Sequence, residues 1–384
     1  MRFEFATAVR IVFGAGAIAE IGTIAKGLGA RALLVTGRST SRAEPIVKRL
    51  ETAGVSSASF PIVGEPTVAA VEAGVQHAKA ERCDMVISLG GGSAMDAGKA
   101  IAAMLANPGE LTDYLEVIGR GQSLSRAGVP FVAIPTTAGT GTEVTRNAVL
   151  GSPGHRFKVS LRSPLILARV ALVDPELTYD LPPALTASTG LDALTQLIEP
   201  FVSIRANPMT DAVCVEGIRR AARSLRRAFE QSQDTAARED MAVASLFGGL
   251  ALANAGLGAV HGFAAPIGGM FPAPHGAVCA ALLPHVMTAN LRALRERGGG
   301  SDALRRYDEI ARLVTGQASA SANDGVMWVR ELCDAVRIPP LHTWGVTEQD
   351  FPSLVEKAAQ ASSMKANPLP LTQEEMRAVL SAAL

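Results

Sequence analysis

The sequence predicts a chain of two parts, an α/β domain with a parallel sheet over residues 1–181 and an all-helical domain over residues 182–384. Up to about Asp180, short β-rich runs alternate with stretches of helical periodicity. That alternation is typical of a parallel sheet covered by helices on both faces. After Leu181 and two prolines the alternation stops, and alanine- and leucine-rich segments with helical spacing continue nearly to Leu384.

Five apolar runs are the expected strands of the first domain. Each is short, and a short apolar run bounded by turn residues is typical of a strand buried on both faces. The stretches between them are compatible with the crossover helices that parallel strands need. In chain order the runs are Ala32 to Thr36, Ser59 to Val63, Met85 to Leu89, Phe131 to Pro135 and Ala171 to Val173.

The third of these runs leads into the most informative turn of the chain. Gly90, Gly91 and Gly92 follow the apolar run and precede a helix-compatible stretch. Consecutive glycines let the backbone turn sharply and approach a ligand closely, Ser93 is suited to cap the helix, and the N-terminal amides would then face a phosphate. The turn predicts a site for a dinucleotide pyrophosphate, although ordinary strand-to-helix turns can have the same pattern.

A loop rich in threonine and glycine follows the predicted strand Phe131 to Pro135. Thr136, Thr137 and Thr140 are part of it, and its glycines keep the backbone free to lie close to a ligand. Threonine hydroxyls can hydrogen-bond ribose, phosphate or an amide group, but they can equally cap their own backbone. Because the glycine turn is also present, we expect this loop to contact the same cofactor.

Composition narrows the class of partner. Lysine plus arginine equals aspartate plus glutamate, at 36 each, so no excess of positive charge indicates nucleic acid or an anionic membrane. The N-terminal residues lack the order of a signal peptide, and no uninterrupted apolar run is long enough to cross a bilayer. The four cysteines have no paired spacing, which favours reduced thiols in a cytoplasm. We therefore expect a small-molecule substrate, no nucleic acid and no membrane.

The helical domain contains a candidate metal site. Asp192 and Gln196 are four residues apart, so on a helix they share one face. His261 and His275 lie far downstream and flank a segment rich in glycine and proline. One carboxylate and two imidazoles match the ligands of a catalytic divalent ion, which needs about three protein ligands and an open position. On spacing alone, histidines that only satisfy buried hydrogen bonds remain an equal alternative.

Taken together, five motifs resemble those of the iron-containing (group III) alcohol dehydrogenase family. The resemblance extends over essentially the whole chain, and the motifs agree in order and spacing. They are Gly90 to Lys99, Pro135 to Glu143, Asp174 to Thr178, Thr189 to Thr195 and Pro274 to Gly276. The family implies a dinucleotide-binding α/β domain and a helical domain, an architecture shared with dehydroquinate synthase. It also implies reversible hydride transfer between an alcohol or carbonyl carbon and a nicotinamide, and association as homodimers or larger homo-oligomers.

The same resemblance implies roles for residues at matching positions. Those implied to hold the pyrophosphate and its neighbours are Gly91, Gly92, Ser93 and Asp96. Those implied to bind the rest of the cofactor are Thr136, Thr137 and Thr140 for the nucleotide and Lys158 for the nicotinamide ribose. The implied metal ligands and catalytic residues are Asp192, His261 and His275.

The chain departs from the family at two positions of the metal site. Family members usually have histidine as a fourth ligand where this chain has Gln196, and often another histidine where it has Ala265. A glutamine carbonyl is a weaker donor than imidazole for a first-row metal. We favour a site of three ligands with Gln196 as a weak or outer partner. The alternatives are a four-ligand iron or zinc site that includes Gln196, and loss of the metal, as in the related maleylacetate reductases.

The choice of cofactor depends on the turn after the predicted strand Ala32 to Thr36. An acidic residue there would bind the adenosine ribose and repel a 2′-phosphate, but the turn reads Gly37, Arg38, Ser39. We therefore predict NAD(P), with NADP slightly favoured. The predicted function is interconversion of a small alcohol and its aldehyde or ketone by metal-assisted hydride transfer. The alternatives are a metal-independent keto-acid reductase and a dehydroquinate synthase-like lyase.

Overall fold

The computed structural model describes residues 2–38, 42–116, 118–152, 154, 157–297 and 302–384. The chain forms two compact units. The first, here called the sheet unit, comprises Ala6–Thr137 and Gly141–Thr178. The second, the helical unit, comprises Met1–Phe5, Ala138–Thr140 and Tyr179–Leu384. Each is described by itself below.

The sheet unit is built on six strands in the order β1-β8-β5-β4-β2-β3, and every neighbouring pair is parallel. This confirms the predicted fold class, and each of the five predicted strands is present with its ends shifted by at most a few residues. The short edge strand β1 was not predicted. The bounds are β1 Arg10–Phe13, β2 Arg31–Thr36, β3 Ser56–Pro61, β4 Met85–Gly90, β5 Phe131–Pro135 and β8 Val170–Val173.

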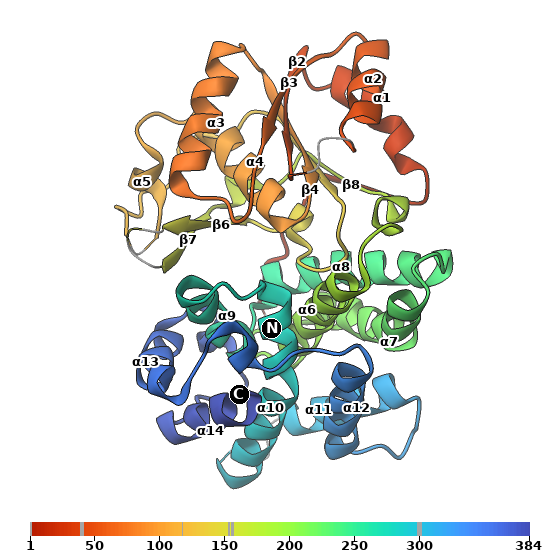
Figure 1. Cartoon of the computed structure of the whole chain (residues 1–384), viewed down its shortest axis with the longest axis vertical. Coiled ribbons are helices and arrows are strands. Elements are labelled where there is room, and N and C mark those ends of the chain that lie inside the picture. The colour runs from red at the N-terminus through yellow and green to blue at the C-terminus, as the bar shows by residue number, and fades with distance from the viewer. Residues whose placement is uncertain (1, 39–41, 117, 153, 155–156, 298–301) are drawn as a thin grey trace. The chain divides into compact units, whose positions relative to one another are not determined.

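Helices cover both faces of this sheet (Figure 1). Helices α1 and α2 pack Ile24, Ile46 and Leu50 against the strand residues of one face, Leu34 and Ile87 among them. Helices α3 and α4 cover the other face. Gly98 of α4 lies so close to β4 that a Cβ added to it would be only 1.9 Å from the Ser88 side chain. The bounds are α1 Ile21–Lys26, α2 Glu44–Thr52, α3 Val68–Ala80, α4 Gly92–Ala106 and the short α5 Leu111–Tyr114.

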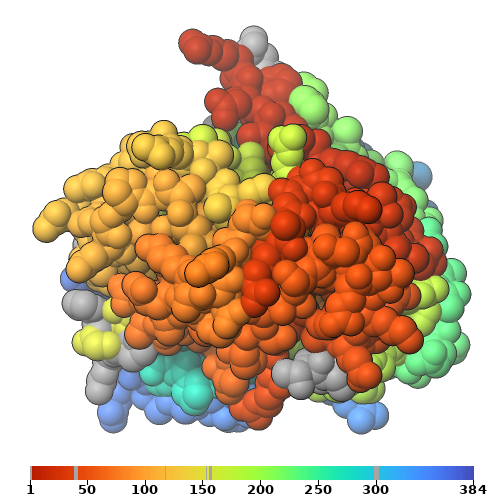
Figure 2. Space-filling view, turned by 90° about the horizontal axis from the view of Figure 1, so that it is seen from above, coloured from red at the N-terminus to blue at the C-terminus, as the bar shows by residue number. Residues whose placement is uncertain are grey.

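A second, two-stranded antiparallel sheet belongs to the same unit. Its strands are β6 (Asn147–Ser152) and β7 (Phe157–Arg162), and neither was predicted. Strand β6 packs against α4, and the backbone amide of Val149 donates to the Asp96 carboxylate. The surface of the unit in the space-filling view is formed by segments coloured red to yellow, from the first part of the chain (Figure 2).

The strand order reverses between β2 and β4. From β2 the chain moves to β3 at one edge, then returns to place β4 on the other side of β2, and β5 follows beyond β4. In open α/β sheets, ligands bind beyond the carboxyl ends of the strands that flank such a reversal. The turn after β2 and the turn after β4 are therefore the expected cofactor turns.

In the helical unit, no strand is present among the residues that the structure describes. Helices α6, α7 and α8 pack against one another, and α10 packs on α6 (Figure 1). The bounds are α6 Pro183–Val202, α7 Pro208–Glu230, α8 Thr235–Ala255, α9 Ala259–Met270, α10 His275–Arg297, α11 Asp302–Thr315, α12 Ala322–Ala335, α13 Phe351–Gln360 and α14 Gln373–Ala383.

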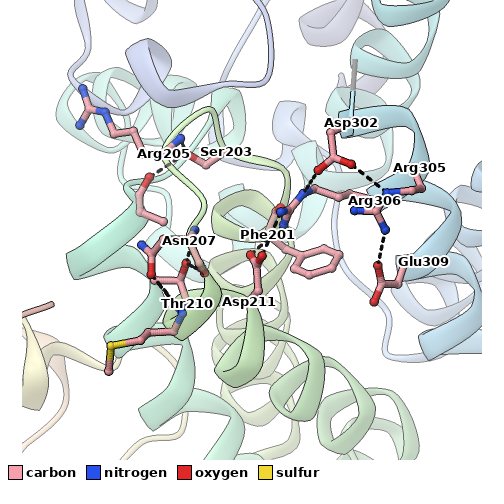
Figure 3. A network of polar contacts seen from close by, with 12 residues as sticks. Phe201, Ser203, Arg205, Asn207, Thr210, Asp211, Asp302, Arg305, Arg306 and Glu309 are labelled. Carbon is pink, nitrogen blue, oxygen red and sulfur yellow. Dashed lines mark hydrogen bonds and ion pairs between the residues drawn. The ribbon is translucent and has the colours of Figure 1, made fainter. Parts of the chain in front are cut away.

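Helix α6 is the central helix of this unit, and every residue from Gly190 to Val202 is buried. Its C-terminal end is anchored by Arg306 of α11. The Arg306 guanidinium donates to the Phe201 carbonyl oxygen at 2.9 Å, lies 5.0 Å from the Phe201 ring centroid, and pairs with Asp211 and Asp302 (Figure 3). Because Asp211 begins α7 and Asp302 begins α11, this network holds three helix ends together.

Helix α10 is apolar along most of its length. Within the described ranges it is the one helix long and apolar enough to cross a membrane on its own, but 78% of its most apolar stretch is buried inside the protein. Val278, Leu282 and Val286 are among its residues in the core of the helical unit. It is therefore a core helix, and its first turn lies at the candidate metal site.

Candidate active site

The glycine turn joins β4 to α4 as predicted. Strand β4 ends at Gly90, Gly91 is the residue that precedes the helix, and α4 begins at Gly92. The prediction that Ser93 caps this helix is wrong, because Ser93 is already inside the first turn and no side chain caps the helix. The first amides of α4 therefore have no side-chain acceptor and are open to an anion.

Three backbone segments come close together at this turn. A Cβ added at Gly90 would lie 2.7 Å from the Ala94 Cβ and 3.4 Å from the amide nitrogen of Gly37, so the turns after β2 and β4 are neighbours. A Cβ added at Gly91 would lie 3.4 Å from the Thr137 hydroxyl. The amide of Thr136 donates to the Gly90 carbonyl at 2.9 Å. The structure thus brings Gly37, Gly91, Thr136 and Thr137 to one place, while Ser39 lies outside the described residues.

Two other predicted cofactor residues, Lys158 and Asp96, have partners within the protein. Lys158 pairs with Glu65 at 3.1 Å, and Arg38 is exposed. Both carboxylate oxygens of Asp96 accept hydrogen bonds, from the Thr142 hydroxyl at 2.7 Å and from the Val149 amide at 3.1 Å. Asp96 therefore holds the loop after β5 and strand β6 against α4, a role that the sequence did not predict.

Asp96 belongs to a buried group that we call the Lys99 cluster, formed by Asp96, Lys99, Thr142 and Thr145. The Lys99 ammonium donates to both threonine hydroxyls at 2.8 Å and to the Asn147 carbonyl oxygen at 2.9 Å. Burial lowers the pKa of Lys99 to about 8, and burial raises the pKa of Asp96 above its usual value. The three donor positions of the ammonium are matched by three oxygens, so the cluster is saturated.

A second buried polar group, which we call the ligand cluster, lies in the helical unit. Helix α6 supplies Asp192 and Gln196, α9 supplies His261, and the first turn of α10 supplies His275 and Cys279. The ligand atoms of the aspartate, both histidines and the cysteine all lie within 4.8 Å of one another. Three of the predicted ligands are thus brought together from segments up to 83 residues apart, as His275 and Asp192 are in the chain.

The distances within the ligand cluster are those of atoms that face a common centre. The Asp192 Oδ1 lies 3.3 Å from the His261 Nε2 and 3.8 Å from the His275 Nε2. The Cys279 Sγ lies 3.8 Å from the first of these nitrogens and 3.7 Å from the second. The cluster is buried except for the His275 side chain, which is 33% exposed.

Two oxygens of this cluster have no hydrogen-bond donor. They are Asp192 Oδ1 and Gln196 Oε1, both buried among the residues that the structure describes. A buried oxygen without a donor is unfavourable by about 1–3 kcal/mol, so a pair of them at one place needs an explanation. A cation bound between the Asp192 Oδ1 and the two imidazoles satisfies the aspartate oxygen. The residues present therefore fit a divalent metal ion.

Electrostatics favours the same conclusion. Burial by itself would raise the pKa of Asp192, but the imidazoles of His275 and His261 and a hydrogen bond from the Gln196 amide bring this pKa below its usual value. Asp192 is thus ionised in a buried place. Gln196 contacts the aspartate through its amide group, as expected for a side chain that supports a ligand.

Glu199 orients His261 and was not predicted. Its Oε2 lies 2.7 Å from the His261 Nδ1, and its Oε1 accepts from the Val260 amide at 2.7 Å. With Nδ1 donating to the carboxylate, Nε2 faces the cluster with its lone pair, an arrangement common around metal-binding histidines. The sequence contained a signal, since Glu199 is seven residues after Asp192 and on the same face of α6.

The start of α9 is also held in place from the C-terminal part of the chain. The Asn367 Oδ1 accepts from the amide of Ala259 at 3.1 Å, and Asn367 and Asn290 are joined by two further hydrogen bonds. The Tyr307 hydroxyl accepts from Asn290 at 3.0 Å. At the second departure from the family, Ala265 is exposed on α9, so no titratable group is present at that position.

Comparison with known proteins agrees with this geometry. The family model described as iron-containing alcohol dehydrogenase matches residues 8–175, and the model of the C-terminal region of the Fe-containing alcohol dehydrogenase family matches residues 186–384. The chain belongs to the iron-containing alcohol dehydrogenase family. This confirms the resemblance of the five motifs.

Relatives of known activity cover nearly the whole chain. Alcohol dehydrogenase 4 of Saccharomyces cerevisiae (strain YJM789) is 37% identical over 377 residues, 97% of this chain and 96% of the relative. The NAD-dependent methanol dehydrogenase of Bacillus methanolicus is 36% identical over 97% of each chain. The 1,3-propanediol dehydrogenase of Klebsiella pneumoniae is 36% identical over 97% of this chain and 96% of the relative.

Solved structures agree in fold. A 1,3-propanediol oxidoreductase superposes with a TM-score of 0.93 at 34% identity, with both chains fully covered. A sulfoacetaldehyde reductase from Bifidobacterium kashiwanohense, in complex with NAD+, superposes with a TM-score of 0.88 at 28% identity over 100% of this chain and 99% of that one. As a member of this family, the chain described in Figure 1 is an oxidoreductase that interconverts alcohols and carbonyl compounds with a nicotinamide cofactor and a divalent metal.

Proposed function

We propose that this dehydrogenase acts on a small alcohol or aldehyde at the ligand cluster, with Asp192, His261 and His275 as metal ligands and catalytic residues. The observation that carries this proposal is the buried Asp192 Oδ1, which has no donor and lies 3.3 Å and 3.8 Å from two imidazole nitrogens. When bound, the divalent metal ion supplies a Lewis acid for the substrate oxygen, and the nicotinamide supplies the hydride chemistry.

The residues of the helical unit prepare the site for that chemistry. Asp192 contributes a buried negative charge, and Glu199 fixes the tautomer and ring orientation of His261. Burial excludes water from Asp192 and His261, while the partly exposed His275 marks the side from which a substrate enters. The Gln196 carbonyl has no donor and is suited to accept a hydrogen bond from a substrate hydroxyl or a water.

Residues of the sheet unit are proposed to bind the cofactor. The amides at the start of α4, where Gly92 is the first residue, and the close backbone approach at Gly91 support a pyrophosphate site, and Thr136 and Thr137 lie beside it. Gly37 lies at the neighbouring turn, with the exposed Arg38 following, which supports use of NADP as well as NAD. We retain Ser93, Asp96, Thr140 and Lys158 as contributors to this region by their positions in the motifs. Dinucleotide binding is thus assigned to residues 1–181 and metal and substrate binding to residues 182–384.

We further propose that the protein is cytoplasmic and forms homodimers or larger homo-oligomers. The four cysteines are all free, which supports a reducing compartment. Membership of the family supports the proposed oligomeric state. Sedimentation of the purified protein tests it directly, since a single species at the mass of one chain would contradict it.

The proposed reaction is tested by metal analysis combined with turnover. The purified protein, prepared without added metal, is analysed for iron and zinc and assayed with NADH and NADPH against a panel of small aldehydes and keto acids. We expect close to one metal ion per chain and turnover that disappears on chelation and returns with metal. Turnover by a metal-free protein that metal does not change would instead assign it to the metal-independent reductases.

A further inference from the structure

Cys279 is the member of the ligand cluster that the family pattern does not assign. It lies on α10 one helical turn after His275, so its side chain and the imidazole share a helix face. Cys279 is fully buried, and its Sγ lies 3.7 Å from the His275 Nε2 and 3.8 Å from the His261 Nε2. The sulfur therefore faces the same centre as the two imidazoles.

Four of the six separations among these atoms are those of a tetrahedral zinc site, and the other two are no longer than 4.8 Å. Zinc bonds of ordinary length at tetrahedral angles separate nitrogen from oxygen ligands by about 3.4 Å and nitrogen from sulfur ligands by about 3.6 Å. The observed separations are 3.3 and 3.8 Å from the Asp192 oxygen to the imidazole nitrogens, and 3.7 and 3.8 Å from those nitrogens to the sulfur. Four donors from three helices are thus placed as a metal ion would hold them.

The chemistry of the donors supports the same conclusion. At the family's fourth ligand position this chain has Gln196, whose amide hydrogen-bonds Asp192. A glutamine in this position offers no charge, whereas a cysteine thiolate adds a second negative charge beside Asp192. Thiolate is a soft ligand that favours zinc, and mixed thiolate, imidazole and carboxylate sets are ordinary zinc chemistry.

We propose that the Cys279 thiolate is the fourth protein ligand of the metal, in place of the missing histidine, so that Asp192, His261, His275 and Cys279 form a centre selective for zinc over iron, to which a substrate oxygen would bind as a fifth ligand. This proposal rests on the proposed function of the cluster as a metal site. Gln196 then supports Asp192 and is not itself a ligand.

The test is the absorption spectrum of the full-length protein loaded with Co²⁺ in place of the native metal. Cobalt bound to a thiolate has an intense charge-transfer band in the near ultraviolet, whereas cobalt bound only to oxygen and nitrogen does not. We expect the wild-type protein to show this band and Cys279→Ser to lose it. The matched control is Cys333→Ser, because Cys333 is also buried in the helical unit but donates to the Ala280 carbonyl oxygen. A further control, Gln196→Ala, keeps the band.

A second measurement is zinc affinity from competition with a chelator. Loss of a residue that merely supports a ligand lowers metal affinity by about 10–100-fold. We expect Cys279→Ser to lower zinc affinity by more than that range, with little change in iron affinity, and Cys333→Ser to leave both unchanged.

The outcomes separate this proposal from the proposed function. Wild-type protein that binds cobalt without the near-ultraviolet band, or Cys279→Ser that keeps it, overturns the cysteine ligand while metal-dependent turnover can stand. A protein that binds no metal overturns both. A cobalt–thiolate band in a protein that turns over no alcohol or aldehyde supports the ligand set and contradicts the proposed reaction.

Discussion

The Lys99 cluster of the sheet unit and the ligand cluster of the helical unit are both buried and polar, yet their hydrogen bonding differs. Lys99 donates to three oxygens, and both oxygens of Asp96 accept. In the ligand cluster, Asp192 Oδ1 and Gln196 Oε1 have no donor within the described part of the chain. The first cluster is complete without a ligand, whereas the second leaves buried oxygens that a cation or a hydrogen-bond donor would satisfy.

This difference separates a buried polar group that is satisfied within the protein from one that leaves oxygens without a donor. Asp96 and Asp192 each lie on a helix rich in small residues, within a motif shared with the family, and each has a polar partner about one turn away. Their sequence contexts are alike. Only the count of donors and acceptors separates a structural carboxylate from a candidate metal ligand.

The largest expected effect is that of Asp192→Asn, which removes the charge from the ligand cluster. Loss of several kcal/mol of stabilisation of the developing charge lowers kcat/KM by about 1000-fold, and bound metal falls with it. Steady-state kinetics and metal analysis on the same preparation measure both. The matched control is Asp96→Asn, which should lower stability and leave the metal content at the wild-type level. Full metal occupancy in the Asp192 variant would contradict its assignment as a ligand.

Lys99→Met breaks the saturated cluster. The substitution leaves the buried Asp96 carboxylate without its counter-charge and three oxygens without a donor, so we expect unfolding to become easier by about 3–5 kcal/mol. Chemical denaturation followed by circular dichroism measures this change. Lys79→Met, on the exposed face of α3, is the control and should be close to neutral. An equally stable Lys99 variant would show that the cluster does not hold the fold.

Glu143 is an exception next to the Lys99 cluster, because it is buried beside Lys99 and its Oε2 has no donor. Burial raises its pKa from 4.5 to about 7. Between these two pKa values the folded protein keeps a proton that the unfolded chain has lost. The contribution of Glu143 to the free energy of unfolding is therefore greatest below pH 4.5 and is lost as the pH rises through about 7. The loss amounts to roughly 3 kcal/mol.

Glu143→Gln, which stays neutral, should remove this fall in stability. The measurement is the difference in free energy of unfolding between wild type and variant across pH 4 to 8, because groups common to both proteins cancel. We expect the curves to be parallel above pH 7 and to converge in the acid range, with the variant more stable at pH 8. Parallel curves across the whole range would contradict a raised pKa at Glu143.

The smallest expected effect is that of Glu199→Gln. The variant loses the charged partner of the His261 Nδ1, so we expect metal affinity to fall by about 10–100-fold while the fold is kept. Competition with a chelator measures the affinity. Glu216→Gln, in a surface ion pair of α7, is the control. Unchanged affinity in the Glu199 variant would mean that packing alone orients the imidazole.

Most of the fold could be predicted from the sequence, because four of the five predicted strands, β2, β4, β5 and β8, are apolar runs that are almost entirely buried. Strand β1 and the β6–β7 pair escaped prediction, since short, half-buried strands lack such a run. In the site, Asp192 and Gln196 could be placed together by their helical spacing. Glu199 and Cys279 could not be assigned, because a role for each depends on His261, which is 62 and 18 residues away in the chain.

The positions of the ligand-cluster residues along the chain have a consequence for folding during translation. Residues 6–178, which supply the sheet unit, leave the ribosome first and can fold while the rest is still being made. Cys279 is synthesised 87 residues after Asp192. Asn367, whose side chain accepts a hydrogen bond from the start of α9, is synthesised close to the end of the chain. We therefore expect a nascent chain to complete its proposed nucleotide-binding turns before its proposed metal ligands.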